Sequence, residues 1–259
     1  MKLNIVPART GIQWVKSGVI TFFRQPLAMA GLFFMFMAVM SVLSFVPVAG
    51  SALALALLPA ATLGLMAGTR EAAAGKFPRP MVLAIALRGS APQRRAMLAL
   101  GLMYAAGFLA VMALSTLLDG GKFASLYLGG GGITRDMAQD GDFLTALWAS
   151  MALYLPVSML FWHAPALVHW HGLPPAKSLF FSFVACLRNA GAFIVYGLAW
   201  LAVFLVSGLL VSLLAGLAGG PGLAATLMFP VAMLLAAMFF TSIHFTVHDC
   251  FETPPGDTA

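Results

Sequence analysis

The sequence has very little charge. Asp, Glu, Lys and Arg make up 8% of its 259 residues, whereas 61% are hydrophobic, and the mean hydropathy is +0.97. A soluble globular protein needs a charged surface that water can wet, so this composition favours an integral membrane protein instead. The 14 Lys and Arg outnumber the 8 Asp and Glu, but they are spread along the chain and do not cluster with aromatic residues. Nucleic acid is therefore not an expected partner.

Cysteine and catalytic motifs are also scarce. Cys186 and Cys250 are the only cysteines, which excludes a disulfide framework and a Cys-x-x-Cys site and predicts two free thiols. No Gly-x-Ser-x-Gly, His-Glu-x-x-His or Asp-rich metal motif is present. Catalysis inside a membrane requires polar groups at depth, and His163 is the one histidine well inside an apolar run. We therefore expect neither an enzyme nor a cofactor.

What the chain does contain is six long apolar runs. They cover residues 26–46, 50–68, 96–118, 143–167, 190–214 and 223–243. A helix of about 20 residues, rising 1.5 Å per residue, crosses roughly 30 Å of hydrocarbon. We therefore predict an all-α integral membrane protein, in which residues 1–259 form a single polytopic domain with six transmembrane helices.

The segment before the first run, residues 9–24, is amphipathic. Its apolar and polar side chains fall on opposite faces of a helix, which predicts an interfacial helix on the membrane surface. The apolar face has Ile12, Val15, Val19, Phe22 and Phe23, and the polar face has Gln13, Lys16, Ser17 and Arg24. A cleaved signal peptide is the alternative, but the leader and the apolar core are both too long for one.

A faint internal repeat runs through the chain. Arginine stands just before each odd-numbered run, in Phe22-Phe23-Arg24-Gln25, Arg94-Arg95 and Cys186-Leu187-Arg188-Asn189, and each even-numbered run contains a proline. The repeat favours three hairpin modules, each preceded by a cytoplasmic interfacial helix. Constraints that act on any membrane helix explain the pattern about as well as duplication does.

The basic residues also predict orientation. Of the 14 Lys and Arg, 12 fall in the N-terminal, 69–95 and 169–189 segments, and two fall in the loop at 119–142. By the positive-inside rule, both termini lie in the cytoplasm of a bacterial inner (plasma) membrane, with multiple spans. The loop at 119–142, which is rich in Gly and Asp, is then expected to face outward as a flexible, solvated segment.

The second run carries a stripe of small residues, one every four positions, which lets another helix approach closely. The stripe contains Ala52, Ala56, Ala60, Gly64 and Gly68. Two interpretations stay open: a face for a homo-oligomer or another membrane protein, and internal packing against a neighbouring span.

Two further sets of residues are candidate binding sites. The basic residues beside the runs are candidates for binding anionic lipid headgroups, or they set topology alone; they are Arg24, Arg94, Arg95, Lys177 and Arg188. The histidines near the cytoplasmic ends of the fourth and sixth runs are candidate metal ligands; they are His163, His169, His244 and His248. Two alternatives to metal binding stay open: the histidines lie at the membrane interface because they suit both water and lipid, or they contact a lipid phosphate when protonated.

Three stretches resemble a family of bacterial multi-spanning inner-membrane proteins that has no established activity. They are GIQWVKSGVITFFRQPLAMAGLFF, FVPVAGSALALALLPA and APALVHWHGLPPAKSLFFSFVACLRNAGAFIVYGLAW. A looser resemblance is to the non-catalytic membrane domain of some glycerophosphodiester phosphodiesterases. The first resemblance implies an inner-membrane location and transfers no ligand or catalytic residue.

The function that the sequence favours is a non-enzymatic scaffold or envelope-maintenance component that contacts lipid headgroups. The alternative is a small-solute transporter or a membrane protein that binds a ligand or metal, because the prolines of the even-numbered runs give a partial version of the broken helices found in transporters.

The orientation can be tested by cysteine labelling. In intact spheroplasts, Cys186 and Cys250 should resist a membrane-impermeant maleimide, whereas a cysteine introduced by Ser125→Cys should react before lysis. Labelling of Cys250 in sealed spheroplasts would overturn the predicted topology.

Overall fold

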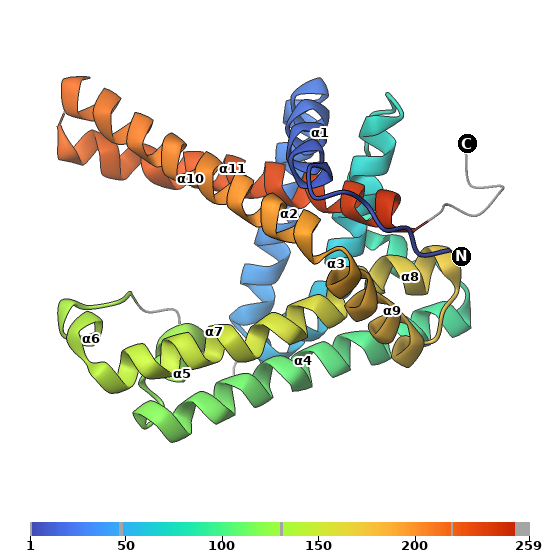
Figure 1. The fold of residues 1–259 in the computed structure, drawn as a ribbon, viewed down its shortest axis with the longest axis horizontal. Helices are drawn as coiled ribbons and strands as arrows, with labels where there is room; N and C mark the ends of the chain where they lie inside the picture. The colour runs from blue at the N-terminus through green and yellow to red at the C-terminus, as the bar shows by residue number, and fades with distance from the viewer. Residues whose placement is uncertain (1, 47–48, 130–131, 219, 252–259) are drawn as a thin grey trace. The chain divides into compact units, whose positions relative to one another are not determined.

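The computed structural model describes residues 2–46, 49–129, 132–218 and 220–251. Within these ranges the chain is helical, and the one β pairing is an isolated bridge between Leu3 and Phe251. Six helices are long and apolar enough to span a membrane, which confirms the predicted all-α, six-span fold. In chain order (Figure 1), the elements are α1 (Thr10–Arg24), α2 (Pro26–Ser44), α3 (Gly50–Ala73), the 3-10 helix η1 (Pro80–Leu87), α4 (Ala91–Asp119), α5 (Lys122–Gly129), α6 (Arg135–Gln139), α7 (Gly141–Phe161), α8 (Ala164–His171), α9 (Pro175–Arg188), α10 (Ala190–Ala218) and α11 (Pro221–Cys250).

Several helices extend beyond the apolar runs that predicted them. α4 begins at Ala91 instead of residue 96, because the Ser90 hydroxyl accepts a hydrogen bond from the backbone N–H of Gln93 and the Gln93 side chain accepts one from the backbone N–H of Ser90. This capping box pairs two N–H groups near the start of the helix. α11 likewise continues to Cys250, past the predicted end at residue 243. An apolar run marks the part of a helix that suits lipid, whereas backbone hydrogen bonding continues to the next cap.

The chain forms two compact units. The first contains residues 1–37, 61–85 and 184–259, and the second contains residues 38–60 and 86–183. α2, α3, η1 and α9 contribute residues to both. The assignment of one polytopic domain stays a prediction.

In the first unit, α1 packs against α10 and α11. A Cβ atom at Gly11 would lie 2.3 Å from the carbonyl oxygen of Ala192, and one at Gly18 would lie 2.4 Å from the Cβ of Ser242. Both distances are shorter than van der Waals contact, so the backbone of α1 approaches its neighbours too closely for any side chain at these two positions.

The second unit is built on α4 and α7, which lie side by side (Figure 1). The hydroxyl oxygens of Tyr104 and Tyr154 are 2.7 Å apart across this pair. The buried cluster between α4, α5 and α7 contains Phe108, Val111, Met112, Phe123, Ala124, Phe143 and Ala146. The short helix α5 therefore covers an apolar core and is part of the packing.

The fourth span is interrupted between α7 and α8. The chain stays helical through Pro156 and breaks at Trp162 and His163, two residues before Pro165. The Ser182 hydroxyl of α9 enters the gap: it donates to the carbonyl of Met159 at 2.8 Å and accepts from the N–H of His163 at 2.9 Å. These two groups would bond each other in a continuous helix, so one serine hydroxyl replaces the missing backbone hydrogen bond.

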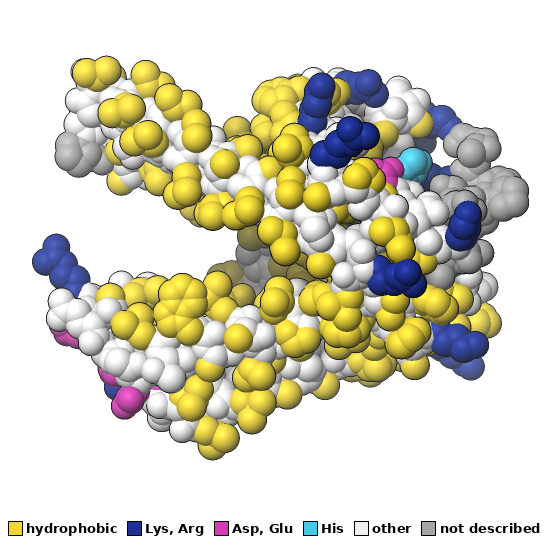
Figure 2. Space-filling view, viewed as in Figure 1, with side chains coloured by type: hydrophobic (Ala, Val, Ile, Leu, Met, Phe, Trp, Pro, Cys, Tyr) yellow, Lys and Arg dark blue, Asp and Glu magenta, His cyan; other side chains and the backbone are white. Residues whose placement is uncertain are grey.

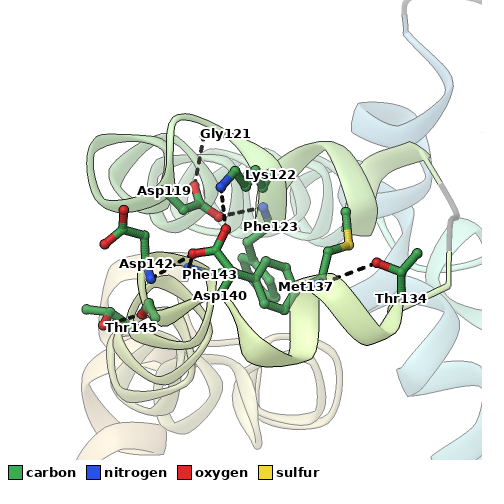
Figure 3. A network of polar contacts seen from close by, with 11 residues as sticks. Asp119, Gly121, Lys122, Phe123, Thr134, Met137, Asp140, Asp142, Phe143 and Thr145 are labelled. Atoms are coloured by element: carbon green, nitrogen blue, oxygen red, sulfur yellow. Dashed lines mark hydrogen bonds and ion pairs between the residues drawn. The ribbon is translucent and has the colours of Figure 1, made fainter.

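The loop at 119–142, predicted to be flexible and solvated, contains two short helices, and most of its described residues are exposed. Its described residues form α5 and α6. Two aspartates cap the starts of α5 and α7 (Figure 3). Asp119 accepts from the N–H of Gly121 and Phe123 at 2.9 and 2.6 Å, and Asp140 accepts from the N–H groups of the first turn of α7. Lys122 donates to Asp140 and so links the start of α5 to the start of α7. Of the predicted glycine run, Gly130 and Gly131 lie outside the described residues.

The small-residue stripe on α3 faces other parts of the same chain. In the first unit, a Cβ at Gly64 would lie 2.6 Å from the Cα of Leu83 in η1, and one at Gly68 would lie 2.7 Å from the Leu32 side chain. In the second unit, a Cβ at Gly101 of α4 would lie 2.0 Å from the carbonyl oxygen of Ala56. These contacts fit the internal-packing interpretation, and the oligomer face stays a prediction.

Replacing Gly64 tests this packing. Gly64→Leu should destabilise the protein by about 1–3 kcal/mol, because overpacking forces the η1 backbone away, and should lower the melting temperature in detergent. The matched control is Gly197→Leu on α10, where no atom lies within 4 Å of the added Cβ. Equal melting temperatures for the two variants would contradict the packing, and a changed oligomer size at unchanged melting temperature would instead support the oligomer face.

The Lys122–Asp140 pair should make stability depend on pH. The hydrogen bond from Lys122 lowers the pKa of Asp140 below its ordinary 3.8, and the hydrogen bond to Asp140 raises the pKa of Lys122 above its ordinary 10.5. The Asp140 contribution is therefore present above pH 3.8 and lost as pH falls through the lowered value, and the Lys122 contribution is lost as pH rises through the raised value.

The corresponding measurement is the melting temperature of the unsubstituted protein minus that of Lys122→Met, followed across pH. The difference should be positive and flat between the two pKa values and should shrink toward acid. Arg135→Met, a basic residue of α6 outside this network, is the control. A difference that keeps its size in strong acid would rule out the proposed role of the pair.

Candidate lipid-headgroup interface

α1 presents three faces instead of the two that the sequence predicted. The buried face contains Thr10, Gly11, Trp14, Val15, Gly18, Thr21 and Phe22. At 100° per residue, the exposed Ile12 and Phe23 lie on the adjacent arc, and the exposed Lys16 and Arg24 follow beyond them. The exposed Ile20 lies between these two basic residues. The predicted apolar face is thus divided: Val15 and Phe22 pack inward on protein, whereas Ile12 and Phe23, which are 57% and 62% exposed, point away from it.

Trp14 anchors the buried face of α1. Its ring packs against Phe193 and Tyr196 of α10, with centroids 5.2 and 5.9 Å away. Its indole Nε1–H donates to the Asp249 carboxylate near the end of α11 at 2.9 Å, and the other oxygen of Asp249 lies 2.9 Å from Nδ1 of His248. The rotation of α1 about its own axis is therefore set by one directed hydrogen bond as well as by packing, and this rotation turns Ile12 and Phe23 outward.

Asn189 holds the N-terminal segment close to the end of α11. Its side-chain oxygen accepts from the N–H of Val6 at 2.8 Å, and its amide donates to the carbonyls of Asn4 and Ala185 at 3.1 and 3.0 Å. The N–H of Asn4 donates to the carbonyl of Cys250 at 2.9 Å. The chain before α1, the α9–α10 corner and the end of α11 are thus held together by one amide.

α9 repeats the arrangement of α1. Its buried face contains Ser178, Leu179, Ser182, Ala185 and Cys186. Phe180 and Leu187, 62% and 52% exposed, lie on the opposite side, and the exposed Lys177 and Arg188 lie on the neighbouring arc. In both α1 and α9, exposed apolar side chains therefore lie beside basic side chains. Each of these helices leads directly into an apolar span.

A side-chain amide stands at the start of each odd-numbered span. Gln25 Nε2 donates to the carbonyl of Lys76 at 3.0 Å, Gln93 Nε2 donates to the carbonyl of His169 at 3.1 Å, and Asn189 Nδ2 lies 3.6 Å from the Cys250 sulfur. Each amide thus holds the chain at or just after the end of the next even-numbered span. This recurrence fits three hairpin modules, which stay a prediction.

All five predicted headgroup residues have exposed side chains. Arg94 and Arg95 lie near the start of α4, just after the capping box, and Arg24 donates to the carbonyl of Ala73 at 3.4 Å. Figure 2 shows basic side chains over α1 and hydrophobic side chains along the visible faces of α7 and α10. Long basic side chains next to exposed apolar groups are what a helix needs at the boundary between headgroups and hydrocarbon.

The predicted metal ligands are divided between the two units. His163 and His169 belong to the second unit, where His163 is buried at the interrupted span. His244 and His248 belong to the first, with ring centroids 6.4 Å apart. Among the described residues, no group of three or more His, Cys, Asp or Glu side chains is arranged to hold a metal ion. The metal site stays a prediction without an observed ligand set.

Both cysteines are free thiols and both are buried. Burial raises the pKa of Cys186, so its thiol stays protonated and reacts slowly with maleimides. The exposed Lys16, on the side predicted to be cytoplasmic, is therefore a better position for a cysteine to compare with Ser125→Cys in the labelling experiment than either native thiol.

Comparison with known proteins identifies a relative over nearly the whole chain. The sequence is 41% identical over 255 residues to a probable inner membrane protein of Burkholderia thailandensis, an alignment that covers 97% of this chain and 94% of that protein. No protein-family profile matches the sequence, and no solved structure matches it. The resemblance to bacterial inner-membrane proteins is thereby confirmed.

Proposed function

The chain belongs to the family of this probable inner membrane protein, and from that premise we propose that it is a non-enzymatic scaffold or envelope-maintenance component whose surface helices contact lipid headgroups. The observation that carries the proposal is the three-faced geometry shared by α1 and α9. One face packs on the spans, one leaves apolar side chains exposed, and one carries exposed Lys and Arg.

The charge distribution supports the choice of ligand. Each Lys or Arg near an anionic leaflet contributes about 1 kcal/mol of attraction. α1 and α9 together present Lys16, Arg24, Lys177 and Arg188 in exposed positions. With 12 of the 14 basic residues on the side of the termini, that side is proposed to be the cytoplasm.

The polar groups of the fold support a non-enzymatic role. Asp249 pairs with Trp14 and His248, and Asn189 has hydrogen-bond partners for both its oxygen and its nitrogen. The interrupted fourth span gives the transporter alternative little support, since Ser182 occupies the gap between Met159 and His163. These polar side chains form hydrogen bonds that hold helices together, which supports a structural role for them.

Lipid retention tests the proposal. Full-length protein is purified in a mild detergent from membranes of phosphatidylethanolamine and phosphatidylglycerol, and the retained lipids are quantified. The unsubstituted protein should be enriched in phosphatidylglycerol, and the Lys16→Gln/Arg24→Gln double variant should lose about fivefold of that enrichment for each charge removed.

The matched control is Arg135→Gln, a basic residue in the loop predicted to face outward. It should keep the full enrichment. An unchanged lipid ratio in the double variant, or an equal loss in Arg135→Gln, would show that the basic residues of α1 do not select anionic headgroups.

The same samples address the scaffold role. A membrane protein that co-purifies in fixed ratio with the unsubstituted chain should be lost when Ile12 and Phe23 are both replaced by serine, because these side chains form the exposed apolar face of α1. Absence of any stoichiometric partner from cross-linked native membranes would contradict scaffolding and leave lipid contact alone.

A further inference from the structure

We propose that Arg24, Lys76 and Arg79 form a binding site for the phosphate of one anionic phospholipid, on the side of the membrane predicted to be cytoplasmic. These three residues, the basic corner, all lie in the first unit and have exposed side chains. The site rests on the proposed headgroup contact of α1. It adds a defined ligand group and two residues that lie on neither α1 nor α9.

Two hydrogen bonds hold the junction of α1 and α2 against the end of α3. Arg24 Nη1 donates to the carbonyl of Ala73, the last residue of α3, at 3.4 Å. Gln25, the residue between α1 and α2, donates from Nε2 to the carbonyl of Lys76 at 3.0 Å. The basic side chains of Arg24 and Lys76 therefore start from segments that are far apart in the sequence but are held together by hydrogen bonds.

The turn after α3 brings Lys76 back to the end of that helix. Its N–H donates to the carbonyl of Glu71 at 2.9 Å, across Gly75, whose φ of +76° is left-handed. This is the long bond of the Schellman motif, which ends many helices. Glu71 and Ala73 belong to one turn of α3, with a pitch of about 5.4 Å. The guanidinium of Arg24 and the backbone of Lys76 therefore lie at the same end of this helix.

The loop that follows α3 has little freedom at Arg79. Pro78 is buried, and a Cβ added at Gly68 of α3 would lie 3.8 Å from its Cβ. Pro80 follows, and proline restricts both its own φ and the conformation of the residue before it. Arg79 is thus held on the same short loop as Lys76, with little backbone entropy left to lose when a ligand binds.

The basic corner has no counter-ion from the protein. Within the part of the chain that the structure describes, no acidic side chain forms an ion pair with any of its three residues. Glu71, the acidic residue nearest to them in the sequence, bonds Lys76 through its backbone carbonyl and not through its carboxylate. Three exposed cations favour an anionic ligand, and a phosphate group offers several acceptor oxygens to guanidinium and ammonium donors at once.

The surroundings favour a lipid phosphate over a free one. Phe23 precedes Arg24 and Phe77 follows Lys76, and these two phenylalanines are 62% and 68% exposed. The first candidate span begins at Pro26, two residues after Arg24. Exposed aromatic rings beside cations are typical of the boundary between headgroups and hydrocarbon. The chains of the bound lipid then contact the rings while its phosphate contacts the cations.

Native mass spectrometry of the full-length protein in detergent tests the proposal. The protein is titrated with dioctanoyl phosphatidylglycerol, with dioctanoyl phosphatidylcholine as a lipid without net charge, and with inorganic phosphate. One phosphatidylglycerol should bind more tightly than any that follow. Equal affinity for phosphatidylcholine would overturn the proposal without any variant. Displacement of the bound lipid by inorganic phosphate at equal concentration would make free phosphate the ligand and overturn the lipid assignment.

A double variant gives the second measurement. Lys76→Gln/Arg79→Gln removes two charges from side chains that form no hydrogen bond in the described part of the structure. It should bind the first phosphatidylglycerol about 25-fold more weakly, about fivefold for each charge. Arg9→Gln/Arg88→Gln removes two exposed charges elsewhere on the side predicted to be cytoplasmic and should keep the full affinity. Equal affinities in these two double variants would overturn the site.

The result is distinguishable from a failure of the headgroup contact itself. If Lys16→Gln/Arg24→Gln loses its phosphatidylglycerol enrichment while Lys76→Gln/Arg79→Gln keeps the one-to-one complex, the headgroup contact of α1 stands and the assignment of the basic corner fails.

Discussion

Hydrocarbon offers no hydrogen bonds to a polypeptide backbone, and the architecture follows from that constraint. The six spans satisfy their backbone groups by helical pairing, and polar side chains close two of the places where helices begin or break. Ser182 bridges the N–H and C=O that the fourth span leaves open, and the capping box of Ser90 and Gln93 closes the start of α4. Because the chain has few charged residues, serine, asparagine and glutamine supply many of these side-chain hydrogen bonds.

A few polar contacts also determine which surface of α1 is exposed. One hydrogen bond from Trp14 to Asp249, together with the contacts of Asn189, holds α1 in a single rotation against α10 and α11. Glycine at positions 11 and 18 lets the helix sit close enough for that bond to form. The exposed arc of α1 is what remains, and its order of apolar and basic residues is the basis of the proposed headgroup contact.

On the side predicted to face outward, aspartates take over the role that amides have on the other side. Asp119 and Asp140 cap helix starts, and Lys122 joins them across the loop. This stabilises α5 over the apolar cluster that includes Phe108. A segment that the sequence marked as flexible thus contributes to a packed structure.

The sequence alone determined the membrane class and the number of candidate spans, because a long uncharged run suits hydrocarbon and can be recognised without any tertiary contact. The five headgroup candidates are exposed, as expected for charged side chains, and their contact with lipid stays a prediction. Tertiary structure alone decided which half of the apolar face of α1 packs inward, since Val15 and Ile12 are equally apolar and only the partner helices distinguish them. It also decided the roles of Asp249, Asn189 and Ser182, whose hydrogen-bond partners lie far away in the chain or across a helix break, where no local spacing reveals them.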